Sequence, residues 1–280
     1  MNPKLTIITP SFNSARFIEE TIRSVKAQTY SPIEHLVMDG GSTDRTLDIL
    51  RRYEDSYDLR WRSEPDRGQS HAFNKGIEAA TGEWLYFLNS DDYLLDSDSI
   101  SRVMDFIQGH PGYFIYMGKI WGVDAQGRTL TENTKPFGHA VYTQQILLNK
   151  DAMVVHQGTF YHRGVFETVG KYSEWCHYHM DYEFHLRVSK YFDILSMPLS
   201  MAALRTHPAA KTKQADSRRA LEMFWARFKN GGRFFHKQNL CFFKSFLTDN
   251  VWSKPFYYAL RNISLLDKLA KKVGWKDLKL

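Results

Sequence analysis

Residues 84–92 read Trp-Leu-Tyr-Phe-Leu-Asn-Ser-Asp-Asp, so a polar stretch that ends in two adjacent carboxylates directly follows an apolar run. The length and aromatic content of residues 84–88 are typical of a buried strand. In open α/β sheets, ligands collect outside the carboxyl ends of the strands, and Mg2+ is held by one or two carboxylates together with substrate phosphates. Asp91 and Asp92 therefore predict a cation site at this strand end. The alternative is that they begin the next helix, because acidic residues favour a helix N-terminus.

On both sides of this stretch, the first hundred residues alternate β-branched runs with helical patterns, which is typical of βαβ units and a mostly parallel sheet. We expect strands at 5–9, 35–38, 59–63 and 84–88, and helices at 16–28, 46–53 and 70–80. Each strand ends in a polar loop, and these loops should meet at one rim of the sheet. No GxGxxG or GxxxxGK[ST] motif occurs at any of them, which argues against dinucleotide-dependent redox chemistry and P-loop hydrolysis.

The composition bounds the class of protein. A chain of 280 residues with 43% hydrophobic content can form one large domain, or one domain with an appendage. Its two cysteines, Cys176 and Cys241, are too few and too far apart for a zinc cluster or a disulfide framework. No signal-peptide pattern and no apolar run of about 18 residues is present. We therefore expect a cytoplasmic protein.

Positive charge is concentrated towards the C-terminus. From residue 205 onward there are 17 Lys+Arg and 5 Asp+Glu, whereas the preceding 204 residues hold 20 and 26. This tail is also aromatic, with helical patterns at 221–228, 240–247 and 256–269. Two interpretations stand: its helices pack back on the rest of the chain, or they form an interfacial surface for anionic lipid on the inner face of the membrane. No nucleic-acid motif accompanies the basic charge, so we expect no nucleic-acid partner.

Five blocks, at 5–13, 37–46, 63–68, 72–76 and 87–92, together resemble the family-2 glycosyltransferases in their order and spacing. The resemblance covers roughly residues 5 to 210. It implies the GT-A fold, an α/β architecture with a Rossmann-like, mostly parallel mixed sheet flanked by helices. The catalytic domain would be 1–210, with a nucleotide-sugar-binding half at 1–110 and an acceptor-binding half at 111–210. A basic, helical C-terminal extension would occupy 211–280.

The same resemblance implies an activity. It predicts an inverting, metal-dependent, non-processive transfer of sugar from a nucleoside-diphosphate sugar, UDP-linked by family preference. The acceptor would be a hydroxyl of a saccharide or lipid-linked molecule in cell-surface polysaccharide or glycolipid synthesis. Processive synthases carry membrane helices and a QxxRW element, and this sequence has neither. Two alternatives remain: a sugar-nucleotidyltransferase, whose Gly-rich signature loop is missing here, and a catalytically silent sugar-nucleotide-binding protein.

The resemblance also assigns the donor pocket. By position Asp39 would hydrogen-bond the nucleoside, with Thr9 and Pro10 lining the same pocket, and Arg67 would lie near the nucleotide and its diphosphate. The alternative for Asp39 is an Asx-turn residue that closes a Gly-rich loop. The family often has a second acidic residue beside this position, where this chain has Gly40.

The DxD-type element of the family is a variant here, because Asn89 replaces its first Asp. Asp91 is the expected ligand for Mn2+ or Mg2+, with Asp92 assisting it and with Asn89 and Ser90 on the nucleotide side. His207 resembles a histidine that binds the metal or diphosphate late in the chain, and an imidazole beside carboxylates suits Mn2+. A loop-capping role is the alternative for His207.

Transfer also needs a base for the acceptor hydroxyl. The segment 179–187 resembles the family's acidic motif at a helix start, and this identifies Asp181 as the expected base in preference to Glu183. An N-terminal Asp that stabilises the helix dipole is a compatible alternative. His156 lies in a segment, 156–161, that resembles a strand on the acceptor side, so it could contact the donor sugar or the acceptor.

Overall fold

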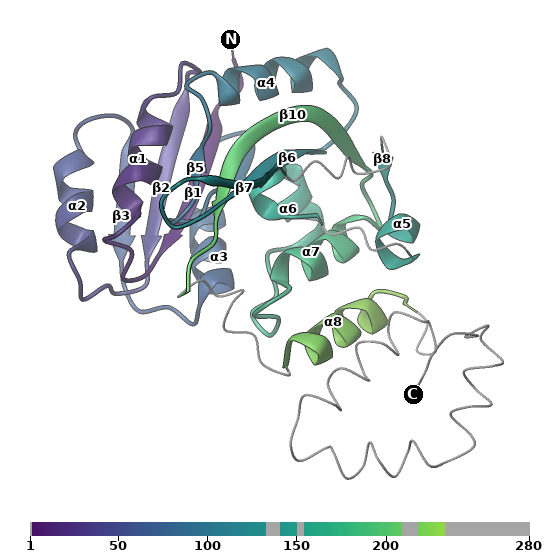
Figure 1. The fold of residues 1–280 in the computed structure, drawn as a ribbon. Coiled ribbons are helices and arrows are strands. Elements are labelled where there is room, and N and C mark those ends of the chain that lie inside the picture. Colours follow the sequence, from purple (N-terminus) through teal and green to yellow (C-terminus); the bar gives the residue numbers. More distant parts are fainter. Residues whose placement is uncertain (1, 133–140, 150–153, 209–217, 233–280) are drawn as a thin grey trace, which may run out of the picture. The chain divides into compact units, whose positions relative to one another are not determined.

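In this computed structural model, residues 2–132, 141–149, 154–208 and 218–232 are described below. The chain divides into two compact units, Met1–Ala210 and Lys211–Leu280. The first contains the sheet (Figure 1). The described part of the second contains α8 (Arg218–Lys229), which overlaps the helix expected at 221–228. The other tail helices expected from the sequence, at 240–247 and 256–269, lie outside the described residues.

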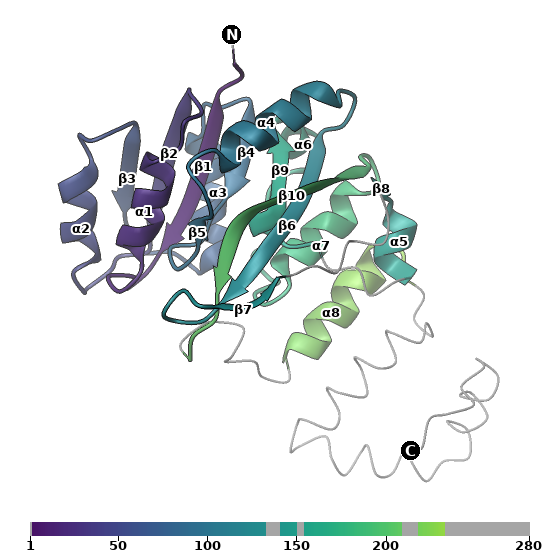
Figure 2. The ribbon, with the colours of Figure 1, turned by 45° about the horizontal axis from the view of Figure 1, so that its top comes forward.

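The N-terminal half is a parallel sheet, as the alternating pattern predicts. It consists of β1 (Leu5–Ser11), β2 (Ile33–Asp39), β3 (Leu59–Ser63) and β4 (Trp84–Phe87), in the spatial order β3-β2-β1-β4. Figure 2 shows these strands side by side. All three pairings are parallel. The carboxyl ends of the strands therefore share one rim, and the polar loops predicted to meet there do so.

Antiparallel pairing extends the sheet beyond β4. The strand β9 (Thr159–His162) lies between β4 and β6 (Ile115–Val123), and β6 runs parallel to β10 (Ile194–Arg205). Three short strands complete it: β5 (Tyr93–Leu94) and β8 (Val141–Tyr142) pair with β10, and β7 (Thr129–Glu132) pairs with β6. The α/β mixed sheet expected from the sequence is confirmed.

Helices cover both faces of this sheet. The helical elements are α1 (Ile18–Lys26), α2 (Thr46–Tyr53), α3 (Gln69–Ala79), α4 (Ser99–Gly109), α5 (Gln144–Asn149), η1 (His156–Gly158), α6 (Gly164–Val169) and α7 (Met180–Val188). Along β1, Leu5 and Ile7 pack in the cluster that includes α4, whereas Ile8 points the other way against Gly76 of α3. This alternation is the period of two that a strand imposes on its side chains.

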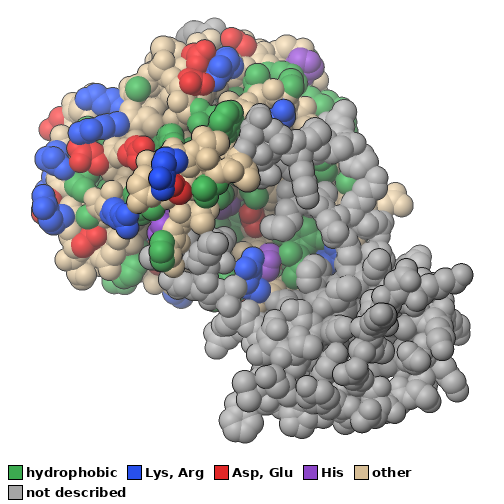
Figure 3. All heavy atoms as spheres, viewed as in Figure 1, with side chains coloured by type: hydrophobic (Ala, Val, Ile, Leu, Met, Phe, Trp, Pro, Cys, Tyr) green, Lys and Arg blue, Asp and Glu red, His purple; other side chains and the backbone are tan. Residues whose placement is uncertain are grey.

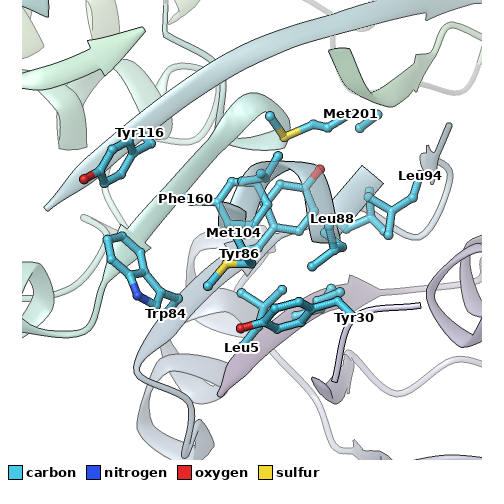
Figure 4. Close-up of a cluster of buried hydrophobic side chains, with 14 of the residues drawn as sticks. Leu5, Tyr30, Trp84, Tyr86, Leu88, Leu94, Met104, Tyr116, Phe160 and Met201 are labelled. Atoms are coloured by element: carbon cyan, nitrogen blue, oxygen red, sulfur yellow. The ribbon is translucent and has the colours of Figure 1, made fainter. Parts of the chain in front are cut away.

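One cluster of buried hydrophobic side chains lies between the sheet and α4, and Figure 4 shows its side chains. Tyr86 of β4 stacks on Phe160 of β9, with ring centroids 4.5 Å apart. The Tyr86 hydroxyl, although buried, donates a 2.6 Å hydrogen bond to the carbonyl of Gln157. Because burying aromatic surface is strongly favourable, this packing fixes the junction of β4 and β9. The candidate site is built at that junction.

On one face of the N-terminal half, charged side chains of both signs are interspersed. Figure 3 shows basic and acidic side chains interspersed over the part of this face built by α1 and α2, where Arg23 pairs with Glu19 and Arg51 with Asp48. Exposed pairs of this kind contribute little to stability. Within the described parts of the chain, no helix has both the length and the apolar character that a membrane span requires.

Candidate active site

The loop after β2 encloses the carboxylate of Asp39. One oxygen, Oδ2, accepts hydrogen bonds from the backbone N–H groups of Gly41 (3.0 Å) and Ser42 (2.8 Å) and from the Ser63 hydroxyl (2.7 Å). The other, Oδ1, accepts one from the Ser42 hydroxyl at 2.5 Å. Asp39 is 2% exposed. The Asx-turn alternative is thus present in the structure, and the chain itself supplies four donors to this carboxylate.

The other residues expected on the nucleoside side lie beneath this loop. Thr9 and Pro10 are buried on β1, next to β2. The Thr9 hydroxyl lies 2.9 Å from Nε2 of His35, whose Nδ1 lies 2.7 Å from the Tyr57 hydroxyl. Burial lowers the pKa of His35 to about 3, so this imidazole is neutral. Thr9 is therefore held in place on β1 by hydrogen bonds that link it to His35 and Tyr57, both neutral.

Asp91 and Asp92, the two aspartates of the 89–92 turn, point in different directions. Asp92 is 2% exposed. Its Oδ1 accepts from the backbone N–H of Arg205 (2.8 Å), and its Oδ2 accepts from the side-chain amides of Gln157 (3.0 Å) and Asn89 (3.1 Å). Burial, followed by the neighbouring Asp91, raises the pKa of Asp92 well above its usual value. Both oxygens of Asp92 thus point into the protein and join the turn to β10 and η1.

Asp91 points instead towards the late histidine. Its Oδ2 lies 3.0 Å from Nε2 of His207, and the two side chains are 28% and 12% exposed. The Asp91 carbonyl accepts a hydrogen bond from the Arg205 guanidinium, which also pairs with Glu20 at 2.5 Å. The His207 ring packs on Phe17, with centroids 4.9 Å apart. The sheet therefore brings residues 91 and 207 together, although they are far apart in sequence.

A carboxylate oxygen and an imidazole nitrogen are suitable ligands for Mn2+. Among the described residues, no group of three or more His, Cys, Asp or Glu side chains could hold a metal ion. The pair fits a cation that takes its remaining ligands from substrate phosphates and water, as Mg2+ sites commonly do. It does not fit a closed structural metal site.

Asn89 lies near His156, within the expected acceptor-binding half, and near Gln69 of α3. Its Oδ1 accepts from Nε2 of Gln69 at 2.7 Å and lies 3.2 Å from Nε2 of His156. Ser90 lies beside it, with its hydroxyl 2.7 Å from that of Ser14. The expected strand at 156–161 begins later than the sequence indicated: residues 156–158 form the short helix η1, and β9 starts at Thr159. This turn directs the His156 ring towards Asn89.

Asp181 lies in the first turn of α7, on the far side of His156. Its Oδ2 is 3.6 Å from Nδ1 of His156, and its side chain is 14% exposed. Burial raises the pKa of this carboxyl, but His156, His185 and the Tyr182 backbone N–H outweigh burial, so the net pKa is lowered. Glu183 is buried on another side of α7 and pairs with Arg187. Asp181 is the carboxylate that lies near the 89–92 turn.

The Arg67 side chain pairs with Glu174, a residue of the expected acceptor-binding half. Its guanidinium forms a two-point pair with Glu174, at 2.7 and 3.0 Å, and this pair raises the pKa of Arg67. The Arg67 side chain is 67% exposed. A diphosphate at the rim would therefore compete with Glu174 for the same guanidinium.

Sequence reasoning assigned no role to Gln69, Gln157 or Arg205, which orient Asn89 and Asp92. Gln157 stood in a block already singled out, next to His156. Its contact with Asp92 could not be read there because it depends on tertiary contacts, among them the pairing of β4 with β9.

Comparison with known proteins finds related sequences and structures. The family described as Glycosyl transferase family 2 matches residues 6–170. A PGL/p-HBAD biosynthesis glycosyltransferase of Mycobacterium bovis is 33% identical over 189 residues, which cover 66% of this chain and 69% of that protein. An uncharacterized glycosyltransferase of Mycobacterium tuberculosis is 30% identical over 188 residues, covering 67% and 69%.

Two solved structures have a similar fold. TarS of S. aureus, in complex with UDP-GlcNAc, has a TM-score of 0.66 and 19% identity, covering 97% of this chain and 78% of that one. A mannosyltransferase of Pyrobaculum calidifontis, in complex with GDP-Man and Mn2+, has a TM-score of 0.63 and 16% identity, covering 98% and 84%. At these identities the likeness concerns the fold.

Proposed function

Because this chain belongs to glycosyl transferase family 2, we propose that it is a metal-dependent, inverting, non-processive transferase that moves a sugar from a UDP-linked donor to an acceptor hydroxyl. One observation carries the proposal. The 89–92 turn and Asp181 lie in a single site, joined by His156, which is 3.2 Å from Asn89 and 3.6 Å from Asp181. The donor-side motif and the expected base thus face one another across one imidazole.

The donor would lie along the rim, with its nucleoside near Asp39 and above Thr9 and Pro10. Asn89 and Ser90 would line the path towards its diphosphate. Arg67 would exchange Glu174 for diphosphate oxygens, since guanidinium groups bind carboxylate and phosphate with the same geometry. TarS in complex with UDP-GlcNAc and the mannosyltransferase in complex with GDP-Man, which share this fold, support a nucleotide-sugar donor.

Asp91 and His207 would hold Mn2+ or Mg2+. When bound there, such an ion offsets the negative charge that develops on the leaving diphosphate. We assign Asp92 a different task, because its oxygens already accept three hydrogen bonds from the protein. Asp92 would hold Asp91 in place by anchoring the turn to β10. Complexes of the mannosyltransferase with Mn2+ support the choice of metal.

In the transfer step, the acceptor oxygen forms a bond to the anomeric carbon while the bond from that carbon to the diphosphate oxygen breaks. Asp181 would take the proton of the acceptor hydroxyl, and its lowered pKa keeps it an ionised base near neutral pH. Attack on the face opposite the leaving group inverts the anomeric configuration. The acceptor would be a saccharide or a lipid-linked molecule.

Nucleotide release tests this proposal. Purified protein would be incubated with Mn2+ and UDP- or GDP-linked sugars, with and without glycolipid and saccharide acceptors, and the free nucleoside diphosphate measured. We expect release of UDP, dependent on metal, and an inverted product by NMR. Tight binding of nucleotide sugars with no turnover on any acceptor would favour a silent binding protein. Incorporation of a sugar phosphate into a nucleotide would favour a nucleotidyltransferase.

The basic, aromatic tail suggests peripheral contact with anionic lipid at the inner membrane face, where a lipid-linked acceptor would lie. Most of that segment lies outside the described residues, so the support is its composition. Flotation with anionic liposomes tests it: the full chain should float with the vesicles and a chain ending near residue 210 should not. Equal behaviour of the two chains would contradict the membrane contact.

A further inference from the structure

Asp66 has an unused carboxylate oxygen at the same rim. It lies in the loop between β3 and α3, where its Oδ1 accepts a 2.7 Å hydrogen bond from the backbone N–H of Gly68. Across the described residues, no hydrogen bond or ion pair reaches Oδ2 of Asp66. Asp39, in contrast, is almost fully buried and already accepts four hydrogen bonds from its own chain. The free carboxylate acceptor at this place therefore belongs to residue 66.

The loop that carries Asp66 is fastened to the loop that follows β2. The backbone N–H of Glu64 donates to the carbonyl of Asp39 at 3.0 Å, and Pro65 packs against Gly41. Lys75 of α3 binds the Pro65 carbonyl at 3.1 Å and the Glu64 carboxylate at 3.0 Å. These contacts hold the position of Asp66 relative to Asp39, so its location is a feature of the fold rather than of a free loop.

Gly40 explains where the Asp66 carboxylate can lie. A Cβ added at Gly40 would be 2.6 Å from Oδ2 of Asp66 and 3.0 Å from its Cγ. The backbone of Gly40 is not left-handed, so the position needs space rather than unusual dihedral angles. Any side chain at residue 40 would displace the Asp66 carboxylate. Gly40 and Asp66 therefore form one unit, in which residue 66 fills the space beside Asp39 that residue 40 leaves empty.

We propose that Asp66 is a nucleoside-recognition residue, whose Oδ2 accepts a hydrogen bond from the N–H or O–H groups of the donor nucleoside. The proposal rests on the proposed function, because it needs a nucleoside at this rim. Asp39 contributes indirectly, because its hydrogen bonds to Gly41 and Ser42 shape the loop that carries Gly40. A carboxylate suits this task, since it only accepts hydrogen bonds and so selects ligands that present donors.

Asp66→Asn tests this role without removing the loop contact. The amide keeps an oxygen for the Gly68 N–H but replaces the free acceptor with an N–H donor. We expect UDP binding, measured by calorimetry with Mn2+, to weaken roughly 10- to 100-fold, as for loss of a hydrogen bond to a charged group. The melting temperature of the free protein should stay within about 2 °C. Asp55→Asn, an exposed acid after α2, is the matched control and should bind UDP as the wild type does.

A carboxylate exchange gives the second test. Gly40→Asp alone should weaken UDP binding, because its side chain meets Asp66. In Gly40→Asp/Asp66→Gly the carboxylate returns from the other loop, and UDP should bind more tightly than to either single variant. Strictly additive losses, or wild-type affinity in Asp66→Asn, would overturn the proposal. If the wild-type chain binds no nucleoside diphosphate at all, the proposed function fails instead. Binding of 2′-deoxy-UDP distinguishes a contact with the ribose 2′-hydroxyl from a contact with the base. If Asp66 contacts that hydroxyl, Asp66→Asn should bind 2′-deoxy-UDP as tightly as the wild type does. If Asp66 contacts the base, Asp66→Asn should bind it more weakly.

Discussion

Nδ1 of His156 lies 3.6 Å from Oδ2 of Asp181, and the same ring presents Nε2 to Asn89 at 3.2 Å. Because the Asn89 amide nitrogen donates to Asp92, its oxygen faces His156 and requires a proton on Nε2. The ring is buried, and Nδ1 has no hydrogen-bond partner. His156 thus couples the donor motif to the expected base.

Asp181→Asn tests the base directly. The amide has almost the same shape but cannot take a proton, so we expect kcat to fall by about 10²- to 10⁴-fold, the usual contribution of a general base. The affinity for UDP should change little, because the contacts of the donor rim remain. Initial rates of UDP release and calorimetry with UDP measure the two quantities.

The matched control for that variant is Glu167→Gln, an exposed carboxylate on α6. It should keep wild-type turnover. Full activity of Asp181→Asn would exclude this residue as the base and direct attention to His156.

The activity should depend on pH in a way set by His156. Asp181 has a folded-state pKa below its usual value, so the carboxylate stays ionised, and its stabilising contribution is present, until the pH falls through that lowered pKa. In His156→Ala, burial still raises the pKa of Asp181, while His156, the largest cause that lowers it, is lost. The acid limb of kcat against pH should therefore move to higher pH.

Initial rates measured over a series of pH values give this shift, and circular dichroism at each pH verifies that the protein is folded. His162→Ala is the control, since His162 lies near the exposed Glu83 at 4.0 Å rather than near Asp181. An acid limb in the same place for wild type and His156→Ala would show that His156 does not tune Asp181.

The fold could be predicted from local patterns because each βα unit carries its own periodicity. The strand at 59–63 and the helix at 46–53 agree with the structure to the residue. The start of α1 at Ile18 and the extension of β2 back to Ile33 depend on neighbouring strands and loops, which local patterns do not contain.

That the candidate residues gather at one end of the strands could be predicted from sequence, but the direction of each side chain could not. Asp91 and Asp92 are adjacent and chemically alike, and only the pairing of β10 with β5 determines that the backbone of Arg205 meets Asp92. Likewise, the free acceptor of Asp66 depends on how two separate loops pack. Motifs record which residues gather at the rim, whereas tertiary contacts decide which oxygens remain available.

UDP release should depend on a metal ion that is bound by Asp91 and His207. Chelation with EDTA should abolish UDP release, and added Mn2+ or Mg2+ should restore it. Loss of an outer-shell partner commonly costs 10- to 100-fold in metal affinity or activity, so Asp91→Ala, which removes a direct ligand, should raise the Mn2+ concentration needed for half-maximal rate at least about 100-fold. A Mn2+ titration of the rate measures it, with the exposed Asp105→Asn on α4 as control. An unchanged Mn2+ requirement in both Asp91→Ala and His207→Ala would contradict the assignment.

Asp92→Ala should instead reduce stability. Removing this carboxylate leaves the Arg205 backbone N–H and the amides of Gln157 and Asn89 without their acceptor in a buried place. Each unsatisfied buried group costs about 1–3 kcal/mol, and partial relaxation should leave a net loss of about 2–3 kcal/mol in the free energy of unfolding. Urea denaturation measures this, and Asp91→Ala, whose side chain is partly exposed, should lose less than about 1 kcal/mol. If Asp92→Ala unfolds like the wild type and loses only metal response, then Asp92 is a ligand and the two neighbouring aspartates share one role.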